Sequence, residues 1–229
     1  MKKQSRKILF LRIIKIIFIA LIIVSLINIL IWYQENNKTK EITQKAKKYI
    51  NISDNNKINP KIKTINEDII GWLIVDNTSI NYPIVQTNNN EYYLNHNLEK
   101  EYSSAGWIFM DSNNKLDDQN IVIYGHHRRD GSMFGSIDNL LNKHKGGKIH
   151  LIINDKTIEY NIFSIYKTDK EYNYRNRNYN NLKKQVQEFK NKSLVEYNVD
   201  TKNINQIITL STCDTNNIER IVVNGVKNN

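Results

Sequence analysis

Residues 207–226 read IITLSTCDTNNIERIVVNGV, and this stretch decides how the fold is predicted. The run Ile207–Leu210 is apolar and largely β-branched, and a second β-branched run follows Arg220. Residues of this kind favour strands, whereas the polar segment Asp214–Asn217 between them favours a turn. We therefore expect two neighbouring strands that hold Cys213, at the end of the first, close to Arg220, at the start of the second.

Cys213 is the only cysteine of the chain. One cysteine excludes an intramolecular disulfide and zinc sites built from several thiolates. A lone cysteine commonly serves as a small buried apolar residue. The polar sequence after Cys213, and the positive charge of Arg220 at strand-turn-strand distance, favour a reactive thiol instead.

The formal net charge of +10 is concentrated near the start of the chain. The first fifteen residues hold six lysines and arginines and no acidic residue, which leaves 27 basic and 23 acidic residues elsewhere. A basic stretch confined to one terminus does not indicate a nucleic-acid partner.

Residues 16–33, IIFIALIIVSLINILIWY, are apolar apart from Ser25 and Asn28. This length is close to the ~20 residues that a helix needs to cross a bilayer. The basic flank before it predicts a cytoplasmic N-terminus and an extracellular remainder. A cleaved signal peptide is the alternative, but it has a shorter apolar core and a small-residue cleavage site, whereas QENN follows here. We therefore expect residues 1–35 to form a cytoplasmic stub and an uncleaved membrane anchor.

Residues 36–64 are predicted to form a stalk or a helical segment. Within them, Lys38–Ile50 has apolar residues at every fourth position, which suggests one weak helical face, and Asn51–Pro60 reads as a loop. Residues 65–229 contain no internal repeat or low-complexity linker and are expected to form one domain.

Short β-branched runs separated by turn residues characterise this domain. Eight short strands with few helices favour a mainly β fold, a closed or nearly closed barrel. The predicted strands are residues 69–75, 80–86, 106–110, 120–124, 148–153, 157–167, 206–212 and 220–226, and the predicted helices are 90–95, 133–143 and 180–191.

A second stretch with chemical potential, NIVIYGHHRRDGSMFG, covers residues 120–135. Its strand ends at His126, and Gly125 is expected to let the backbone turn and to keep bulk away from the imidazole. Because residues alternate faces along a strand, His126 and His127 should not both face a cleft, and either could be the functional one. Without a partner, His126 would simply be a loop histidine.

Two charged pairs are expected to be solvated. Arg128 and Arg129 suggest a basic surface patch, with contact to an acidic wall polymer as the alternative. Asp117 and Asp118 suggest a solvated turn, and neither this pair nor the five histidines follow a metal-binding spacing.

Cys213, His126 and Arg220 together supply the groups that acyl transfer needs. A thiol of pKa about 8.5 needs a partner for its proton, and an imidazole can take that proton and later give it to a leaving amine. A guanidinium suits the oxygen on which negative charge develops. No acidic third member stands out, and Asp214 is not assigned because a carboxylate beside the thiol would raise the thiol pKa.

These motifs resemble those of the sortases. TLSTC (209–213) followed by Arg220, with YGHH (124–127) and DGSMFG (130–135) upstream, is similar to the family pattern in the family's order. The GWIFMD run (106–111) and the helix between the last strands resemble class B sortases in particular. The resemblance spans about residues 65–226, although the Cys213–Arg220 turn is short.

The resemblance implies an eight-stranded sortase-type barrel and a membrane-anchored cysteine transpeptidase of a Gram-positive cell envelope. Such enzymes cut a C-terminal sorting signal after its threonine, hold the acyl fragment as a thioester and pass it to an amine of a wall peptide or peptidoglycan precursor. It implies no metal or other cofactor. Cys213 would be the nucleophile, His126 the acid/base and Arg220 the stabiliser.

The resemblance also suggests substrate-binding residues. Ser211 and Thr212 would line the site beside the thiol, and Asn90 and Leu94 would border the peptide groove. Two other functions remain open at this point: a membrane-tethered cysteine endopeptidase that only hydrolyses, and a non-catalytic module that binds the cell wall.

Overall fold

The computed structural model describes residues 2–51, 57–142, 146–154, 156–213 and 219–228; the side chains of residues 2–6, 142 and 213 lie outside the described part. The predicted turn Asp214–Asn217 therefore lies outside the described residues. The chain divides into two compact units, Met1–Glu41 and Ile42–Asn229.

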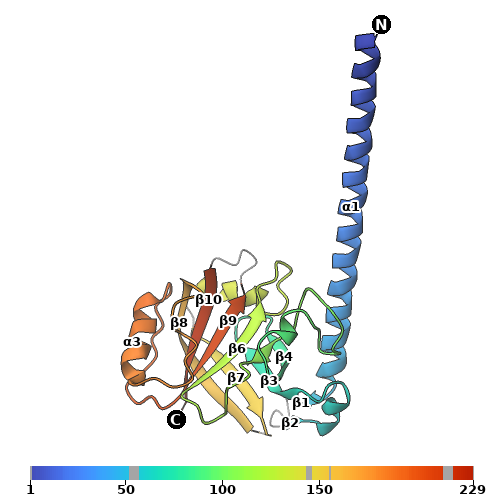
Figure 1. The fold of residues 1–229 in the computed structure, drawn as a ribbon. Helices are drawn as coiled ribbons and strands as arrows, with labels where there is room; N and C mark the ends of the chain where they lie inside the picture. Colours follow the sequence, from blue (N-terminus) through green and yellow to red (C-terminus); the bar gives the residue numbers. More distant parts are fainter. Residues whose placement is uncertain (1, 52–56, 143–145, 155, 214–218, 229) are drawn as a thin grey trace. The chain divides into compact units, whose positions relative to one another are not determined.

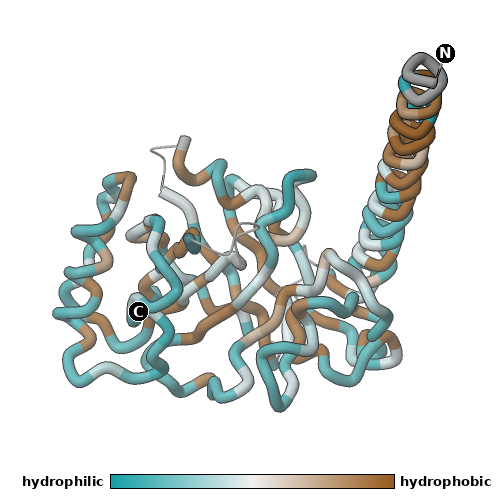
Figure 2. The backbone as a smooth tube through the Cα atoms, turned by 45° about the horizontal axis from the view of Figure 1, so that its top comes forward, coloured by the Kyte–Doolittle hydropathy of each residue, from teal (hydrophilic) through white to brown (hydrophobic). Residues whose placement is uncertain are grey.

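The first unit is most of the helix α1 (Lys2–Lys47). Its apolar stretch is brown in Figure 2, has a mean hydropathy of 2.9 over eighteen residues and has no buried side chain. A helix with uncovered apolar side chains on all sides suits an apolar medium. The predicted span 16–33 lies within α1, which is long and apolar enough to cross a membrane.

The end of α1 belongs to the second unit and packs on it. Ile42 and Ala46 are buried in the main core, and Ile50 packs against that core, as their four-residue spacing suggested. The expected loop 51–60 is only partly correct, because β1 (Ile50–Asn51) pairs with β2 (Lys57–Ile58). A 3₁₀ turn, η1 (Pro60–Thr64), then leads into the barrel.

The second unit is built on a closed barrel, which confirms the predicted fold class (Figure 1). Its strand order in the described residues is β10-β8-β7-β3-β4-β5-β6-β9. The strands are β3 (Ile69–Val75), β4 (Asn81–Val85), β5 (Phe109–Met110), β6 (Asn120–His126), β7 (Lys148–Ile153), β8 (Lys156–Asp169), β9 (Ile207–Cys213) and β10 (Glu219–Lys227).

Each predicted strand corresponds to one barrel strand, and β3 and β7 match at both ends. The largest difference is β5, which begins at Phe109 rather than at Gly106. Gly106 has φ +56°, outside the extended region, so the segment before β5 turns instead of pairing.

The helical segments of the barrel are short apart from α3 (Leu182–Lys192). A 3₁₀ turn, η2 (Tyr92–Leu94), lies within the predicted 90–95 segment. The predicted helix 133–143 is replaced by η3 (Gly135–Asp138) and α2 (Asn139–Asn142), and its last residue lies outside the described part. Asn181 caps the start of α3, and its side chain accepts a bond from the Lys184 backbone N–H.

Two apolar clusters hold the second unit together. Alternate residues of β9 enter different clusters, because Ile208 and Leu210 join the main core whereas Ile207 joins the one formed with α3. Leu182, Val186 and Phe189, the predicted apolar face of α3, are buried in the second cluster. Ser211 is four residues after Ile207 and therefore lies on the same face of β9, which α3 helps to cover.

The expectation of a solvated Asp118 is wrong. Its carboxylate is buried and accepts bonds from the Asn114 and Asn178 amides and from the Lys115 backbone N–H. Burial works against ionisation, but these donated bonds outweigh it and hold the pKa of Asp118 below its usual value. Asp118 therefore stabilises the turn that leads into β6.

Candidate functional site

Three neighbouring strand ends carry the predicted catalytic residues. Strands β6 and β9 pair in parallel, and their last Cα partners are His126 and Cys213. Strand β10 runs antiparallel to β9, beside it in Figure 1, with Val222 opposite Ser211. Cys213 and Arg220 each lie two residues beyond that pair. The ends of β6 and β9 and the start of β10 therefore share one end of the barrel.

A cavity of about 170 Å³ opens at this place. Four of its eight lining residues are among those expected at the site, and the other four are aromatic or cationic. The lining residues are Asn90, Leu94, Phe109, Tyr124, Tyr174, Arg175, Ser211 and Arg220. The backbone of Cys213 belongs to β9, while its side chain lies outside the described part.

The two adjacent histidines have different partners. Nε2 of His126 lies 2.7 Å from the backbone carbonyl oxygen of Leu94, a residue that lines the cavity. Nε2 of His127 lies 2.7 Å from the Asp138 carboxylate. Of the two histidines, His126 is therefore the one joined to the wall of the cavity.

The role expected for Gly125 belongs to a different glycine. A Cβ at Gly125 would lie 3.0 Å from the Phe134 ring, so this glycine makes room for Phe134. A Cβ at Gly106 would lie 2.8 Å from Cδ2 of His126. Gly106, which was not predicted from the sequence, is therefore the residue that keeps bulk away from the imidazole.

Asn90 is held by a buried carboxylate. Its Nδ2 donates to Asp111 at 2.8 Å, and its Oδ1 accepts from the Ser112 backbone N–H at 2.7 Å. The Tyr124 hydroxyl donates to the same Asp111 oxygen at 3.0 Å. Burial raises the pKa of Tyr124, and the charge of Asp111 raises it further, so this hydroxyl remains a donor. Among the described residues, the Asn90 amide donates only to Asp111, which leaves its second N–H for a ligand.

Arg175 is a second cation of the cavity that was not predicted from the sequence. Its guanidinium lies 5.5 Å from the centre of the Tyr174 ring and donates to the Lys170 carbonyl oxygen at 3.0 Å. The Tyr174 hydroxyl lies 3.0 Å from that of Ser211. Of the described residues that line the cavity, two carry a guanidinium and none carries a carboxylate, which suits a ligand rich in carbonyl oxygens.

Thr212 does not line the cavity, contrary to expectation. It is fully buried, and its hydroxyl oxygen accepts a bond from the Ile221 backbone N–H at 2.9 Å. Successive residues of a strand point to opposite faces, so Ser211 and Thr212 cannot both reach the same cavity. Thr212 instead ties the end of β9 to the start of β10.

Arg128 is also less solvated than expected. Its side chain is 11% exposed, and its Nε lies 3.5 Å from the Asp130 carboxylate. Arg129 is exposed, as predicted. Arg128 is therefore covered and Arg129 is solvated, so the two arginines do not form a continuous basic surface patch.

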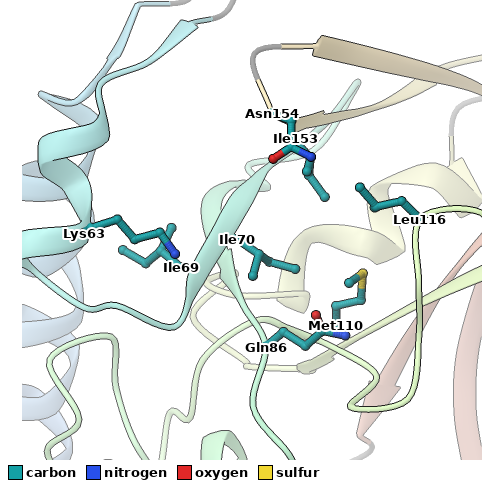
Figure 3. A pocket seen from close by; sticks show the side chains of 8 residues that line it. All are labelled: Lys63, Ile69, Ile70, Gln86, Met110, Leu116, Ile153 and Asn154. Atoms are coloured by element: carbon teal, nitrogen blue, oxygen red, sulfur yellow. The ribbon is translucent and has the colours of Figure 1, made fainter.

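A larger cavity, of about 290 Å³, is lined by a different set of residues (Figure 3). Its walls include Ile69 at the start of β3, Ile153 at the end of β7 and Leu116 before β6. These positions belong to the end of the barrel where β6 begins, whereas His126 lies where β6 finishes. The size of a cavity is thus no guide to the site here.

Within the residues that the structure covers, no group of three or more histidine, cysteine, aspartate or glutamate side chains is arranged to hold a metal ion. Three features define this protein as a barrel-type cysteine transpeptidase. They are the closed barrel, the helix between β8 and β9, and the order of the histidine and cysteine motifs along the sequence. The sortase domain model matches residues 73–228, and the chain belongs to the sortase family.

The similar proteins are class B sortases. The chain is 31% identical over 231 residues to Sortase B of Staphylococcus aureus, covering 93% of this chain and 95% of that protein. It is 35% identical over 164 residues to Sortase B of Listeria monocytogenes, covering 67% of this chain and 66% of that protein. A solved Staphylococcus aureus sortase B–substrate complex has a TM-score of 0.66 at 31% identity, covering 84% of this chain and 92% of that one.

Proposed function

We propose that this protein cleaves a C-terminal sorting signal after its threonine and transfers the protein to a cell-wall peptide amine. The observation that carries the proposal is the register of β6 and β9, in which His126 and Cys213 are partners beside a cavity that contains Arg220. Ser211, two residues before Cys213 in β9, lines that cavity. A related Staphylococcus aureus sortase B has been solved with a substrate, which supports a peptide occupant.

The reaction has two halves. The Cys213 thiolate attacks the threonine carbonyl carbon, an S–C bond forms, the C–N bond breaks and the leaving amine takes a proton from His126. An acceptor amine then attacks the thioester carbon, a new C–N bond forms and the S–C bond breaks. The proton of that amine returns to His126. Arg220 donates to the carbonyl oxygen while it carries negative charge in each half.

The peptide would lie in the cavity described above. Ser211, Leu94 and the remaining amide N–H of Asn90 would contact its backbone or side chains. Arg175 and Tyr174 would close the other wall. The partners on this proposal are surface proteins with a sorting signal and a peptidoglycan precursor or wall peptide that supplies the amine.

The first unit would hold the enzyme at the membrane. We assign residues 1–35 to a cytoplasmic stub and a single-pass anchor, residues 36–64 to a connecting segment and residues 65–229 to an extracellular catalytic domain. The apolar length of α1 and the basic residues before its apolar stretch support this orientation. Protease treatment of intact cells should degrade the second unit and spare an N-terminal tag.

Trapping the acyl-enzyme tests the reaction directly. A panel of threonine-containing peptides should add the mass of the acyl fragment to Cys213, and Cys213→Ala should show no adduct. Addition of an amine such as triglycine should convert the adduct into a ligated product. Hydrolysis at an unchanged rate, with no ligation, would instead identify an endopeptidase. An unaltered cellular phenotype of Cys213→Ala would support a wall-binding module.

A further inference from the structure

We propose that the backbone carbonyl of Leu94, kept in place by Gly106, orients the His126 imidazole and makes Nδ1 its acid/base atom. The inference rests on the proposed acid/base role of His126. It assigns to a main-chain group the orienting function for which the sequence offers no acidic residue.

The hydrogen bond between His126 and Leu94 has only one possible direction. A carbonyl oxygen can only accept, so the 2.7 Å contact between His126 Nε2 and Leu94 O requires a proton on Nε2. In the neutral imidazole the other nitrogen, Nδ1, then carries the lone pair. Nδ1 is therefore the atom able to take a proton from the thiol or from an acceptor amine.

The Leu94 carbonyl is held in a fixed position. The Leu94 N–H donates to Glu91 O at 3.1 Å, and the side chain of Asn89 accepts from two backbone N–H groups at the start of the same turn. The Trp107 N–H donates to Tyr93 O at 2.8 Å. The turn η2 is thus tied to the segment that contains Gly106.

Gly106 lies very close to the turn and to the imidazole. A Cβ there would lie 2.6 Å from Tyr93 O, 2.7 Å from Leu94 O and 2.8 Å from His126 Cδ2. Two of these neighbours are backbone atoms, which cannot rotate away as a flexible side chain can. Gly106 also has φ +56°, a conformation that glycine adopts most readily. Only glycine at this position lets the turn, the carbonyl and the imidazole meet.

The group that accepts the His126 hydrogen bond is uncharged. In the described part of the chain, no carboxylate forms an ion pair or hydrogen bond with His126, whereas His127 has Asp138. A neutral acceptor fixes the ring and its tautomer without adding a negative charge beside the thiol. That arrangement suits a site in which a thiolate must form.

Nitrogen NMR of the wild-type protein tests the tautomer. Histidine labelled with ¹⁵N, at a pH where the imidazoles are neutral, should show His126 with a protonated Nε2 and an unprotonated Nδ1. The signal is assigned by its loss in His126→Gln. A protonated Nδ1 would overturn the proposal, whether or not the protein forms an acyl-enzyme.

A pair of glycine variants tests the positioning. Gly106→Ala should lower kcat by about 10- to 100-fold, leave KM within about threefold and produce a mixture of His126 tautomers. Gly131→Ala is the matched control, because Gly131 also has positive φ but a Cβ added there would meet no described atom within 4 Å. Gly131→Ala should leave kcat, KM and the His126 tautomer unchanged. If Gly106→Ala retains kcat and the single tautomer, Gly106 has no positioning role. Failure of the wild-type protein to form a Cys213 adduct would instead refute the proposed function.

Discussion

His126 and Cys213 are partners at the last position of a parallel strand pair, β6 and β9. Paired parallel strands run in the same direction, so the barrel brings the two residues together at one end although they are far apart in the sequence. Strand β10 then returns beside β9 with Arg220 near its start. The hydrogen bonds of the barrel thus determine the spacing of the three backbone positions.

Replacement of Arg220 by lysine should remove most turnover. The bond from Arg220 to Glu219 O, at 3.3 Å, uses one of five N–H donors and leaves the others for the substrate oxygen. An ammonium cannot reproduce the guanidinium fork, so kcat should fall by about 10²- to 10³-fold. Steady-state ligation assays measure the change, with the exposed Arg129→Lys as control. A fully active Arg220→Lys enzyme would rule out the assigned role.

Asn90→Ala should weaken substrate binding more than catalysis. Asn90 keeps one amide N–H for a ligand, and it lies in the cavity wall rather than at the strand ends. Loss of one contact made equally in ground and transition states should raise KM about tenfold and leave kcat within about twofold. Asn88→Ala, at an exposed neighbouring position, is the control. A fall in kcat with unchanged KM would show that Asn90 acts in the chemical step.

Phe189→Ala should destabilise the second unit. Phe189 lies on the buried face of α3 and is fully buried, with its ring centre 5.8 Å from that of Tyr166. Truncation of a buried phenylalanine should lower the free energy of unfolding by about 3–5 kcal/mol. Urea denaturation provides the measurement, and the exposed Lys183→Ala on the same helix should change it by less than about 0.5 kcal/mol. Equal stability of the two variants would mean that α3 contributes little to the fold.

Asp118→Asn should destabilise the protein at neutral pH but not in acid. The carboxylate accepts from three donors, whereas an amide offers only one acceptor oxygen. Because the folded pKa of Asp118 is lowered, its contribution is present above the unfolded value of about 3.9 and is lost as the pH falls through the folded value.

The measurement is the difference in unfolding free energy between Asp118→Asn and the wild type as a function of pH. It should be about 1–3 kcal/mol at pH 7 and should shrink below about pH 4. Asp117→Asn, at the exposed neighbouring position, should show no such pH dependence. A difference that stays constant down to acid pH would contradict the role given to the Asp118 charge.

Local patterns predicted the elements well because strand formation follows from short-range chemistry. Alternating and β-branched runs located every barrel strand, and the spacing of Leu182, Val186 and Phe189 identified the buried face of α3. The motifs around Cys213 and His126 indicated the family for a similar reason, since each motif is contiguous in the chain.

Only the tertiary structure decided which distant groups meet. Gly106 and the Leu94 carbonyl reach His126 from a separate turn, and backbone groups leave no signature in a sequence. Asp118 became a buried acceptor because three donors from two segments converge on it. Sequence patterns record local preferences, whereas hydrogen bonds and close contacts between remote segments exist only once the barrel has closed.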